Sequence, residues 1–355
     1  MHLRSGRPAG QSYGHRRDPQ GWQDDVHAPV SGSTSLWRYV AGRLVQAVPL
    51  LLGIIIVNFL LIALAPGDPV AVLLGEYPAP PEYVARLREQ FGLDQPMLVR
   101  LGRYVGSVLR ADLGFSFAYR LPVARLVLDR LGNTLILMGT AMTVAAIAGV
   151  ALGVAAARRP HSRLDSSATG LSLVGYSIPE FWLGQLLVLL FAVTLAWLPA
   201  QGIRTTRETY AGWAAAADLG RHLILPALAL SFRYIALISR ITRASMLEVM
   251  SQDYILAARA RGAEEGRVLW RHGLRNAAIP VVTVIGYNYA FIVAGSALVE
   301  TVFGWPGVGR LIYDAILQRD TPVLLGVLLV VSATVVVVNL LTDIAYAYLD
   351  PRVRY

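Results

Sequence analysis

The chain has 355 residues, of which 55% are hydrophobic and only 15% are charged, whereas an average soluble domain carries about 25% charged residues. It contains no cysteine, and all 32 basic residues are arginine against 23 acidic residues, which gives a net charge of +9. These absences exclude disulfides, cysteine-ligated metals and a phosphate-binding-loop lysine, so this chain is not itself a Walker-type ATPase.

Its apolar residues are gathered into six blocks, each long enough to cross a bilayer. A hydrocarbon core about 30 Å thick needs roughly 20 helical residues, because a helix satisfies its backbone hydrogen bonds within one segment. We therefore predict an all-α polytopic membrane protein with six transmembrane helices. The blocks cover residues 44–64, 135–157, 170–198, 223–239, 277–299 and 323–344.

Residues 1–36 precede these blocks and show no apolar period. They are rich in Gly, Ser, Pro, Arg, His and Gln, a composition that buries too little apolar surface to fold. We predict a disordered cytoplasmic tail there and a transmembrane domain over residues 37–355. The first block has about 21 residues, whereas the apolar part of a signal peptide has about 7 to 15, so we expect this helix to be retained.

Arginine counts orient the chain in the membrane. The short segments on one side carry 18 arginines, and the opposite short loops carry five. Because positive charge accumulates on the cytoplasmic side, both termini are expected in the cytoplasm. The long loop over residues 66–131 then lies outside. Its segments 82–91 and 98–109 have the apolar spacing of amphipathic helices that form a cap on the membrane surface.

Polar side chains inside the apolar blocks are candidates for a translocation path, because such groups face protein or water rather than lipid. The two ionisable ones, Glu180 and Arg233, are expected either to pair with each other or to contact charges of a transported molecule. Pro179 should kink the overlong third block. Small residues of the second block, such as Ala145 and Gly149, suit close helix packing. The candidates are Asn58, Glu180, Gln185, Arg233, Asn288 and Asn339.

The segment between the fourth and fifth blocks, residues 240–276, is too polar to enter lipid. Helical spacing predicts one face that carries Tyr254, Ala257, Ala258 and Arg261. Gly262 follows as a helix stop, and residues 264–272 predict a second short helix. Small residues flanked by arginines form a knob that fits a partner's groove, but the same pattern is typical of an ordinary solvated loop.

The same segment carries a family resemblance. The run Asp253–Gly262, continued by Trp270–Val282, is similar to the EAA-type loop of ABC importer permeases. More narrowly, the chain resembles the B-type permease of the dipeptide, oligopeptide and nickel importers from about Trp37 to Tyr355. Five further motifs support this resemblance in order along the chain: Ala65–Pro69, Phe91–Pro96, Asp112–Ser116, Ser177–Trp182 and Glu300–Gly309.

By that resemblance, the loop is the coupling helix that docks on a cytoplasmic ATPase subunit. Two positions depart from the general pattern. Leu256 stands where the pattern has a glutamate, so a contact made by that carboxylate is not carried over, and the pattern's later proline falls on Arg275. The residues expected to couple to the ATPase are Tyr254, Ala257, Ala258, Arg259, Arg261, Gly262 and Glu264.

The resemblance also implies location, partners and cargo. We expect a multi-pass protein of the bacterial cytoplasmic (inner) membrane, not itself an enzyme, with no cofactor, no metal and no nucleic acid. The expected partners are the lipid bilayer, a second homologous permease subunit, two ATP-binding cassette subunits and an extracytoplasmic solute-binding protein. The cargo is expected to be a dipeptide or oligopeptide, while glutathione-like molecules and chelated nickel stay open.

Two other function classes have less support. A secondary carrier or channel, working without an ATPase, is the main alternative, but the sequence shows neither an internal repeat nor an acidic proton relay. An intramembrane enzyme is disfavoured because the sequence contains no His-Glu-x-x-His and no Gly-x-Ser-x-Gly motif.

Overall fold

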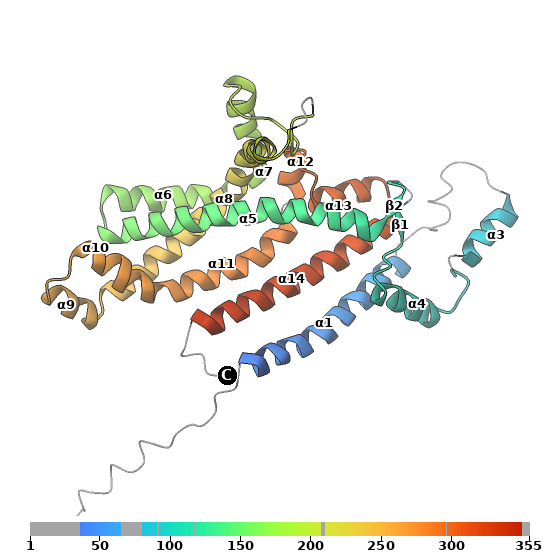
Figure 1. The fold of residues 1–355 in the computed structure, drawn as a ribbon, viewed down its shortest axis with the longest axis horizontal. Helices are drawn as coiled ribbons and strands as arrows, with labels where there is room; N and C mark the ends of the chain where they lie inside the picture. Colours follow the sequence, from blue (N-terminus) through green and yellow to red (C-terminus); the bar gives the residue numbers. More distant parts are fainter. Residues whose placement is uncertain are drawn as a thin grey trace, which may run out of the picture.

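The computed structural model describes residues 36–64, 80–90, 92–116, 118–206, 210–295 and 297–349. The predicted tail, apart from its last residue, and the motif Ala65–Pro69 lie outside these residues. Within them, long helices run roughly along one direction (Figure 1). The long helices are α1 (Leu36–Leu64), α5 (Val123–Arg158), α8 (Trp213–Met250), α11 (Arg275–Gly295) and α14 (Thr321–Leu349).

Four of the described helices are long and apolar enough to cross a membrane by themselves: α5, α8, and the segments Ala41–Leu61 of α1 and Thr321–Ile344 of α14. A bent helix pair makes a fifth if it is counted as one span. The helix α11 occupies the fifth predicted block without being among these, so the count of six spans stays a prediction.

Two helices extend well beyond the apolar blocks that predicted them. The helix α5 begins at Val123, within the predicted outer loop of residues 66–131, and α8 continues to Met250, so that it includes the first eleven residues of the predicted cytoplasmic loop. The membrane boundaries of these loops stay predictions, because hydropathy measures only the part of a helix that lies in lipid. Polar residues such as Arg125 and Arg243 are good helix formers and extend the helix past it.

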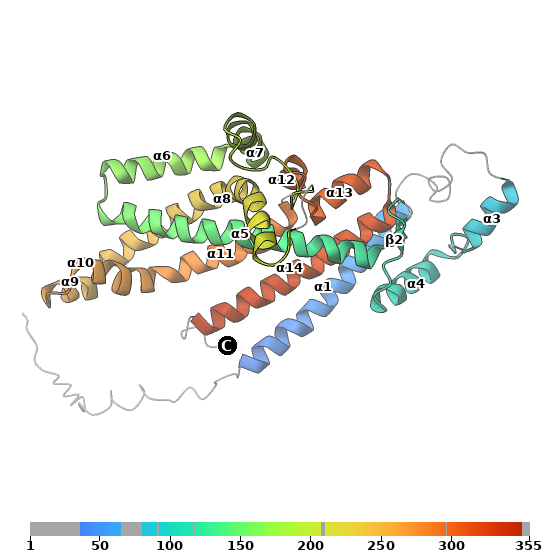
Figure 2. The same cartoon turned by 45° about the horizontal axis from the view of Figure 1, so that its top comes forward.

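The third block is a broken helix. It forms α6 (Arg163–Ser177), α7 (Glu180–Leu187) and the π-helix η1 (Val188–Thr194), with a bend of 103° between α6 and the α7–η1 segment. Ile178, before Pro179, has φ −79° and ψ 126°, the extended conformation that a following proline favours. The kink predicted at Pro179 is confirmed, and it is sharp enough to turn α7 across the bundle (Figure 2).

The helices α5 and α8 form the core through unusually close packing. A Cβ atom on Gly149 would lie 2.8 Å from Cβ of Ile238, and one on Gly153 would lie 2.6 Å from the carbonyl oxygen of Ser239. Only glycine allows this approach, as at the small-residue interfaces of membrane helices. The predicted packing role of Ala145 and Gly149 is confirmed, since both are buried.

The two ends of the bundle carry different elements, and both views place them far apart (Figures 1 and 2). At the loop end lie α9 (Asp253–Ala260) and α10 (Glu265–Arg267), followed by the π-helix η2 (Val268–Leu274). The opposite end, called the hairpin end, carries two predicted helices, confirmed here as α3 and α4, and an antiparallel strand pair. Its elements are α3 (Pro81–Gln90), α4 (Met97–Leu109), β1 (Phe115–Ser116), β2 (Leu121–Pro122), α12 (Ala297–Val302) and α13 (Val308–Leu317).

Candidate functional site: the loop between α8 and α11

The helix α9 is anchored by one face and exposed on the rest. Ile255 is fully buried and Ala258 is 4% exposed, and their spacing of three residues places both side chains on the same side of the helix. Tyr254, Ala257 and Arg261 are exposed. Ala258 lies one helical turn from Tyr254, as the predicted face requires, but at the buried edge of that face next to Ile255.

Gly262 ends α9 in a Schellman motif. Its φ is +79°, a left-handed conformation that is costly for residues with a Cβ atom. The N–H of Gly262 donates to the carbonyl of Arg259 at 2.9 Å, and the N–H of Ala263 donates to the carbonyl of Ala258 at 3.2 Å. These bonds satisfy the last carbonyls of the helix, so the predicted helix stop at Gly262 is confirmed.

An ion pair closes the turn between α9 and α10. Arg259 donates from Nη2 to Oε1 of Glu265 at 2.8 Å and from Nε to Oε2 at 3.2 Å. These hydrogen bonds lower the pKa of Glu265 and raise the pKa of Arg259. Glu264, which the sequence predicts to contact the ATPase, is exposed and makes no ion pair with any described residue. Its coupling role stays a prediction.

The second half of the loop is continuous with α11. The π-helix η2 follows α10 directly and leads into Arg275, so the predicted separate helix over residues 264–272 is only the first part of a longer helical segment. Val268 and Leu269 are buried, whereas Trp270 is 54% exposed. The hydroxyl of Tyr254 accepts a hydrogen bond from Nδ2 of Asn276 at 2.9 Å. The loop is therefore fastened to the base of α11 at several points.

The outward surface of the loop combines charge with apolar side chains. Leu256 is 57% and Trp270 is 54% exposed, and each lies within three residues of an arginine in the sequence. Of the loop arginines, only Arg259 forms an ion pair with a described residue. The arginines that face solvent are Arg259, Arg261, Arg267 and Arg271. A basic surface with apolar anchors suits a protein partner with acidic groups around an apolar groove.

The polar candidates inside the bundle do not gather at one point. Glu180 and Arg233 form the predicted pair, with Nη1 and Oε1 3.8 Å apart. Of the six candidates, all within the described residues, no other two are joined by an ion pair or a hydrogen bond. Asn58 is buried, and its Nδ2 has no partner among the described residues. Asn288 donates to the carbonyl of Val284, while Gln185 and Asn339 are exposed.

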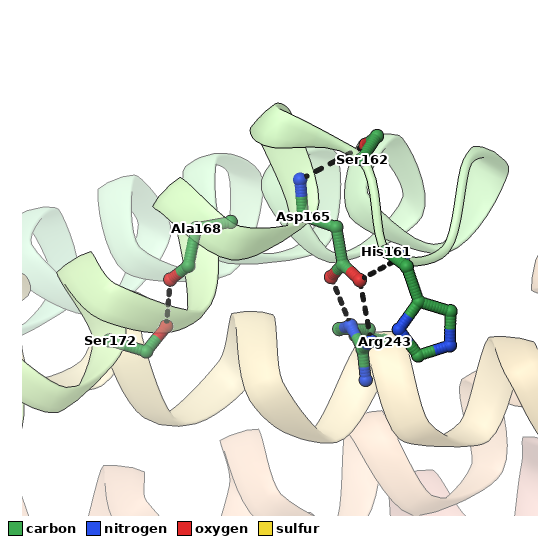
Figure 3. A network of polar contacts seen from close by, with 6 residues as sticks. All are labelled: His161, Ser162, Asp165, Ala168, Ser172 and Arg243. Carbon is green, nitrogen blue, oxygen red and sulfur yellow. Dashed lines mark hydrogen bonds and ion pairs between the residues drawn. The ribbon is translucent and has the colours of Figure 1, made fainter.

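A clamp at the loop end of α6 was not predicted from the sequence. Arg243 of α8 donates from Nη2 to Oδ2 of Asp165 at 2.7 Å and from Nε to Oδ1, as Figure 3 shows. The N–H of His161 donates to Oδ2 of Asp165 at 2.9 Å, and Ser162 caps α6 by accepting from the N–H of Asp165. The cap spacing from Ser162 to Asp165 was visible in the sequence, but the partner arginine 78 residues away was not.

A second network that was not predicted lies at the hairpin end, within the motif Glu300–Gly309. Glu300 is fully buried. Its Oε1 accepts from the hydroxyl of Thr134 at 2.8 Å, and its Oε2 accepts from the N–H of Arg310 at 2.9 Å. The hydroxyl of Thr134 also accepts from the N–H of Val308. Together Glu300 and Thr134 satisfy two N–H groups that α13 leaves open at its start.

Comparison with known proteins identifies relatives over nearly the whole chain. Residues 149–355 match the family described as "Binding-protein-dependent transport system inner membrane component", and residues 36–138 match its N-terminal companion. The chain is 42% identical over 317 residues to "Probable peptide ABC transporter permease protein y4tP" of Sinorhizobium fredii, covering 89% of this chain and 99% of that protein. It is 39% identical over 322 residues to "Oligopeptide transport system permease protein AppB" of Bacillus subtilis, with the same coverage.

Among solved structures, an inward-facing conformation of the MetNI methionine ABC transporter has a similar fold. The TM-score is 0.52 at 17% sequence identity, and the match covers 63% of this chain and 96% of that chain. At this identity the likeness concerns the fold alone. It confirms the predicted helical fold.

Proposed function

Because the chain belongs to the family of binding-protein-dependent transport system inner membrane components, as its motifs predicted, we propose that it is the permease subunit of an ATP-driven importer of peptides. The relatives named as peptide and oligopeptide permeases support peptides as the cargo class. The chain itself performs no catalysis in this proposal. ATP is hydrolysed by two separate ATP-binding cassette subunits, and a second permease and an external solute-binding protein complete the assembly.

The observation that carries the proposal is the way α9 is mounted. Its inner face, Ile255 and Ala258, is buried and α9 packs on η2, while Ala257, Arg261 and Gly262 are exposed at the loop end. A helix held in this manner transmits a push from a docked subunit, because packed interiors do not absorb displacement easily. The Tyr254–Asn276 hydrogen bond and the Arg259–Glu265 pair link α9 to the segment that continues into α11.

The translocation path is proposed along the face where α6 breaks. Irregular backbone and charged side chains are tolerated at membrane depth only where protein or a water-filled cavity covers them. The break at Ile178–Pro179 is irregular backbone, and the Glu180–Arg233 pair directly after it supplies charged side chains. Arg233 is 48% exposed, so we infer that a water-filled path covers this face. The second permease would complete the wall of the path. Asn58, Gln185, Asn288 and Asn339 remain candidates for its other polar contacts.

Reconstitution tests this function against the carrier alternative. The chain is purified from its native membrane, its companions are identified, and uptake of labelled peptides into liposomes is measured with and without ATP. We expect a Walker-type ATPase and a second permease to co-purify, and uptake to require ATP. Uptake by this chain alone would establish the carrier alternative instead.

A substitution at Gly262 tests the coupling role. Gly262→Arg places a bulky residue at φ +79° on the exposed side of α9, where a Cβ atom would meet no heavy atom within 4 Å. The complex is expected to insert and assemble, yet ATP hydrolysis should no longer drive uptake. Gly102→Arg, also at an open glycine but in α4 at the hairpin end, is the matched control. Normal uptake by the Gly262 variant would contradict the coupling role.

A further inference from the structure

A groove of about 320 Å³ lies between α6 and α8, near the loop end. Its apolar walls include Leu173 and Leu237, and hydroxyl groups line it at Thr169, Ser172 and Ser177. Arg243, which is clamped to Asp165 (Figure 3), lines the end of the groove nearest the loop. The groove thus combines a hydrocarbon-like lining with polar groups, a mixture that suits an amphipathic ligand.

The groove contains one cation without a protein counter-ion among the described residues. Arg240 is exposed and forms no ion pair with any of them. Its Cζ lies 6.0 Å from the ring centroid of Tyr176, on which Arg233 also stacks at 5.1 Å. The nearby carboxyl groups are already engaged, Asp165 by Arg243 and Glu180 by Arg233. The local field in the groove therefore favours an anion.

The depth of Arg240 indicates where that anion comes from. It lies three residues before Arg243 on α8, which is about 4.5 Å along a helix axis. Arg243 contacts Asp165 in the first turn of α6, directly after the turn that carries Arg158 and Arg159. Arg240 is therefore within one helical turn of the level where the chain enters the membrane, and its long side chain reaches the headgroup layer.

A comparison of Arg240 with Arg233 also indicates that the anion comes from the lipid headgroup layer. Arg233 lies seven residues further from the loop end, about 10 Å deeper along the helix, and the protein supplies its counter-ion through Glu180. The shallower Arg240 has none among the described residues. An anionic headgroup is available at the shallow level and absent at the deeper one, which explains why only the deeper arginine needs a carboxylate from the chain.

We propose that the α6–α8 groove binds an anionic glycerophospholipid, such as phosphatidylglycerol. Its phosphate pairs with Arg240 and accepts from the hydroxyl of Thr169, which makes no hydrogen bond with a described residue. Its acyl chains lie along the side of α6 that lines the groove, where Leu173 is 63% and Tyr176 is 54% exposed. Basic pockets between membrane helices on the cytoplasmic side bind such headgroups. The groove lies apart from the coupling loop but adjoins the break in α6 where the translocation path is proposed, so lipid retention and peptide uptake are measured separately.

Lipid retention by the full complex tests the site. The complex is exchanged into nanodiscs of phosphatidylcholine with or without phosphatidylglycerol, washed in detergent, and the retained lipid is quantified by mass spectrometry. We expect the unaltered complex to retain phosphatidylglycerol in preference to phosphatidylcholine. Arg240→Gln should weaken that retention by about fivefold, the factor for one basic residue at an anionic surface, while Arg240→Lys keeps most of it.

Two controls make the result decisive. Arg310→Gln removes another half-exposed arginine, at the hairpin end of the chain, and should retain phosphatidylglycerol normally. Gel filtration and circular dichroism verify that each variant is folded, which is expected because Arg240 is exposed. Equal retention by the unaltered and Arg240→Gln complexes would overturn the proposal. So would an Arg240→Gln variant that loses peptide uptake while it keeps its lipid, because the groove would then serve the cargo.

Discussion

The start of α13 and the coupling loop use similar polar groups in opposite ways. At α13, the carboxyl group of Glu300 is fully buried, and both its oxygens and the hydroxyl of Thr134 are occupied within the bundle. In the loop, Glu265 is 48% exposed and Arg259 is 38% exposed, and neighbouring arginines have no described partner. Closed polar networks hold the fold together, whereas open ones leave charge available for another molecule.

The largest effect is expected where the network is closed. Glu300→Ala leaves the N–H of Arg310 and the hydroxyl of Thr134 without their buried acceptor, so the folded permease should lose about 3 kcal/mol. Thermal unfolding of the purified protein and its amount in the membrane measure this loss. Asp314→Ala is the control, since its pair with Arg310 is half exposed at 3.8 Å and should cost within about 1 kcal/mol. Equal melting temperatures would show that α13 does not depend on Glu300.

A somewhat smaller effect is expected from the contact between α5 and α8. Gly153→Val places its Cβ about 2.6 Å from a backbone oxygen, which cannot move aside as a flexible side chain does. Overpacking of this kind costs about 1–3 kcal/mol, so the melting temperature should fall. Gly132→Val, at a glycine of the same helix with nothing within 4 Å, should change it far less. If both variants melt alike, the close packing of α5 and α8 contributes little to stability.

The sequence was informative where a single segment determines the structure. Hydropathy predicted the helical bundle because lipid leaves the backbone no alternative, Pro179 predicted the break because its ring acts on its own neighbours, and Gly262 predicted the end of α9. Each of these rests on local covalent geometry. Helix lengths were predicted less well, since a polar extension such as the last turns of α8 is compatible with either a helix or a loop.

The interactions that were not predicted each join distant or ambiguous positions. The cap of α13 requires residues near 134, 300 and 310 to meet, and the clamp of α6 joins residues 165 and 243. The spacing of apolar residues along one segment does not predict contacts between residues that are far apart in the sequence. The pair between Arg259 and Glu265 was not predicted either. Adjacent side chains point in different directions, and the left-handed turn at Gly262 decides which glutamate faces Arg259.

In the loop, a conformational change should affect coupling more than stability. Gly262→Ala meets no steric obstacle but forces a Cβ into the left-handed region, at a cost of about 1–2 kcal/mol to the local turn. Because Gly262 itself is exposed and the buried side chains of α9 are unchanged, we expect the global melting temperature to change little. The ratio of peptide taken up to ATP hydrolysed should fall. An unchanged ratio would mean that the shape of the α9 end is not what the ATPase recognises.

The smallest effect is expected from the ion pair that closes the turn. Glu265→Gln removes a pair that is more than a third exposed on both sides, so stability should change by less than about 1 kcal/mol. Since the pKa of Glu265 is lowered in the folded protein, its contribution is present above the ordinary glutamate pKa and is lost only as pH falls through the lower folded value. Melting curves of the variant and the unaltered protein should therefore differ by a constant small amount between about pH 6 and pH 8, and converge in acid. A difference that changes across that neutral range would indicate that another titrating group, and not Glu265, controls the turn.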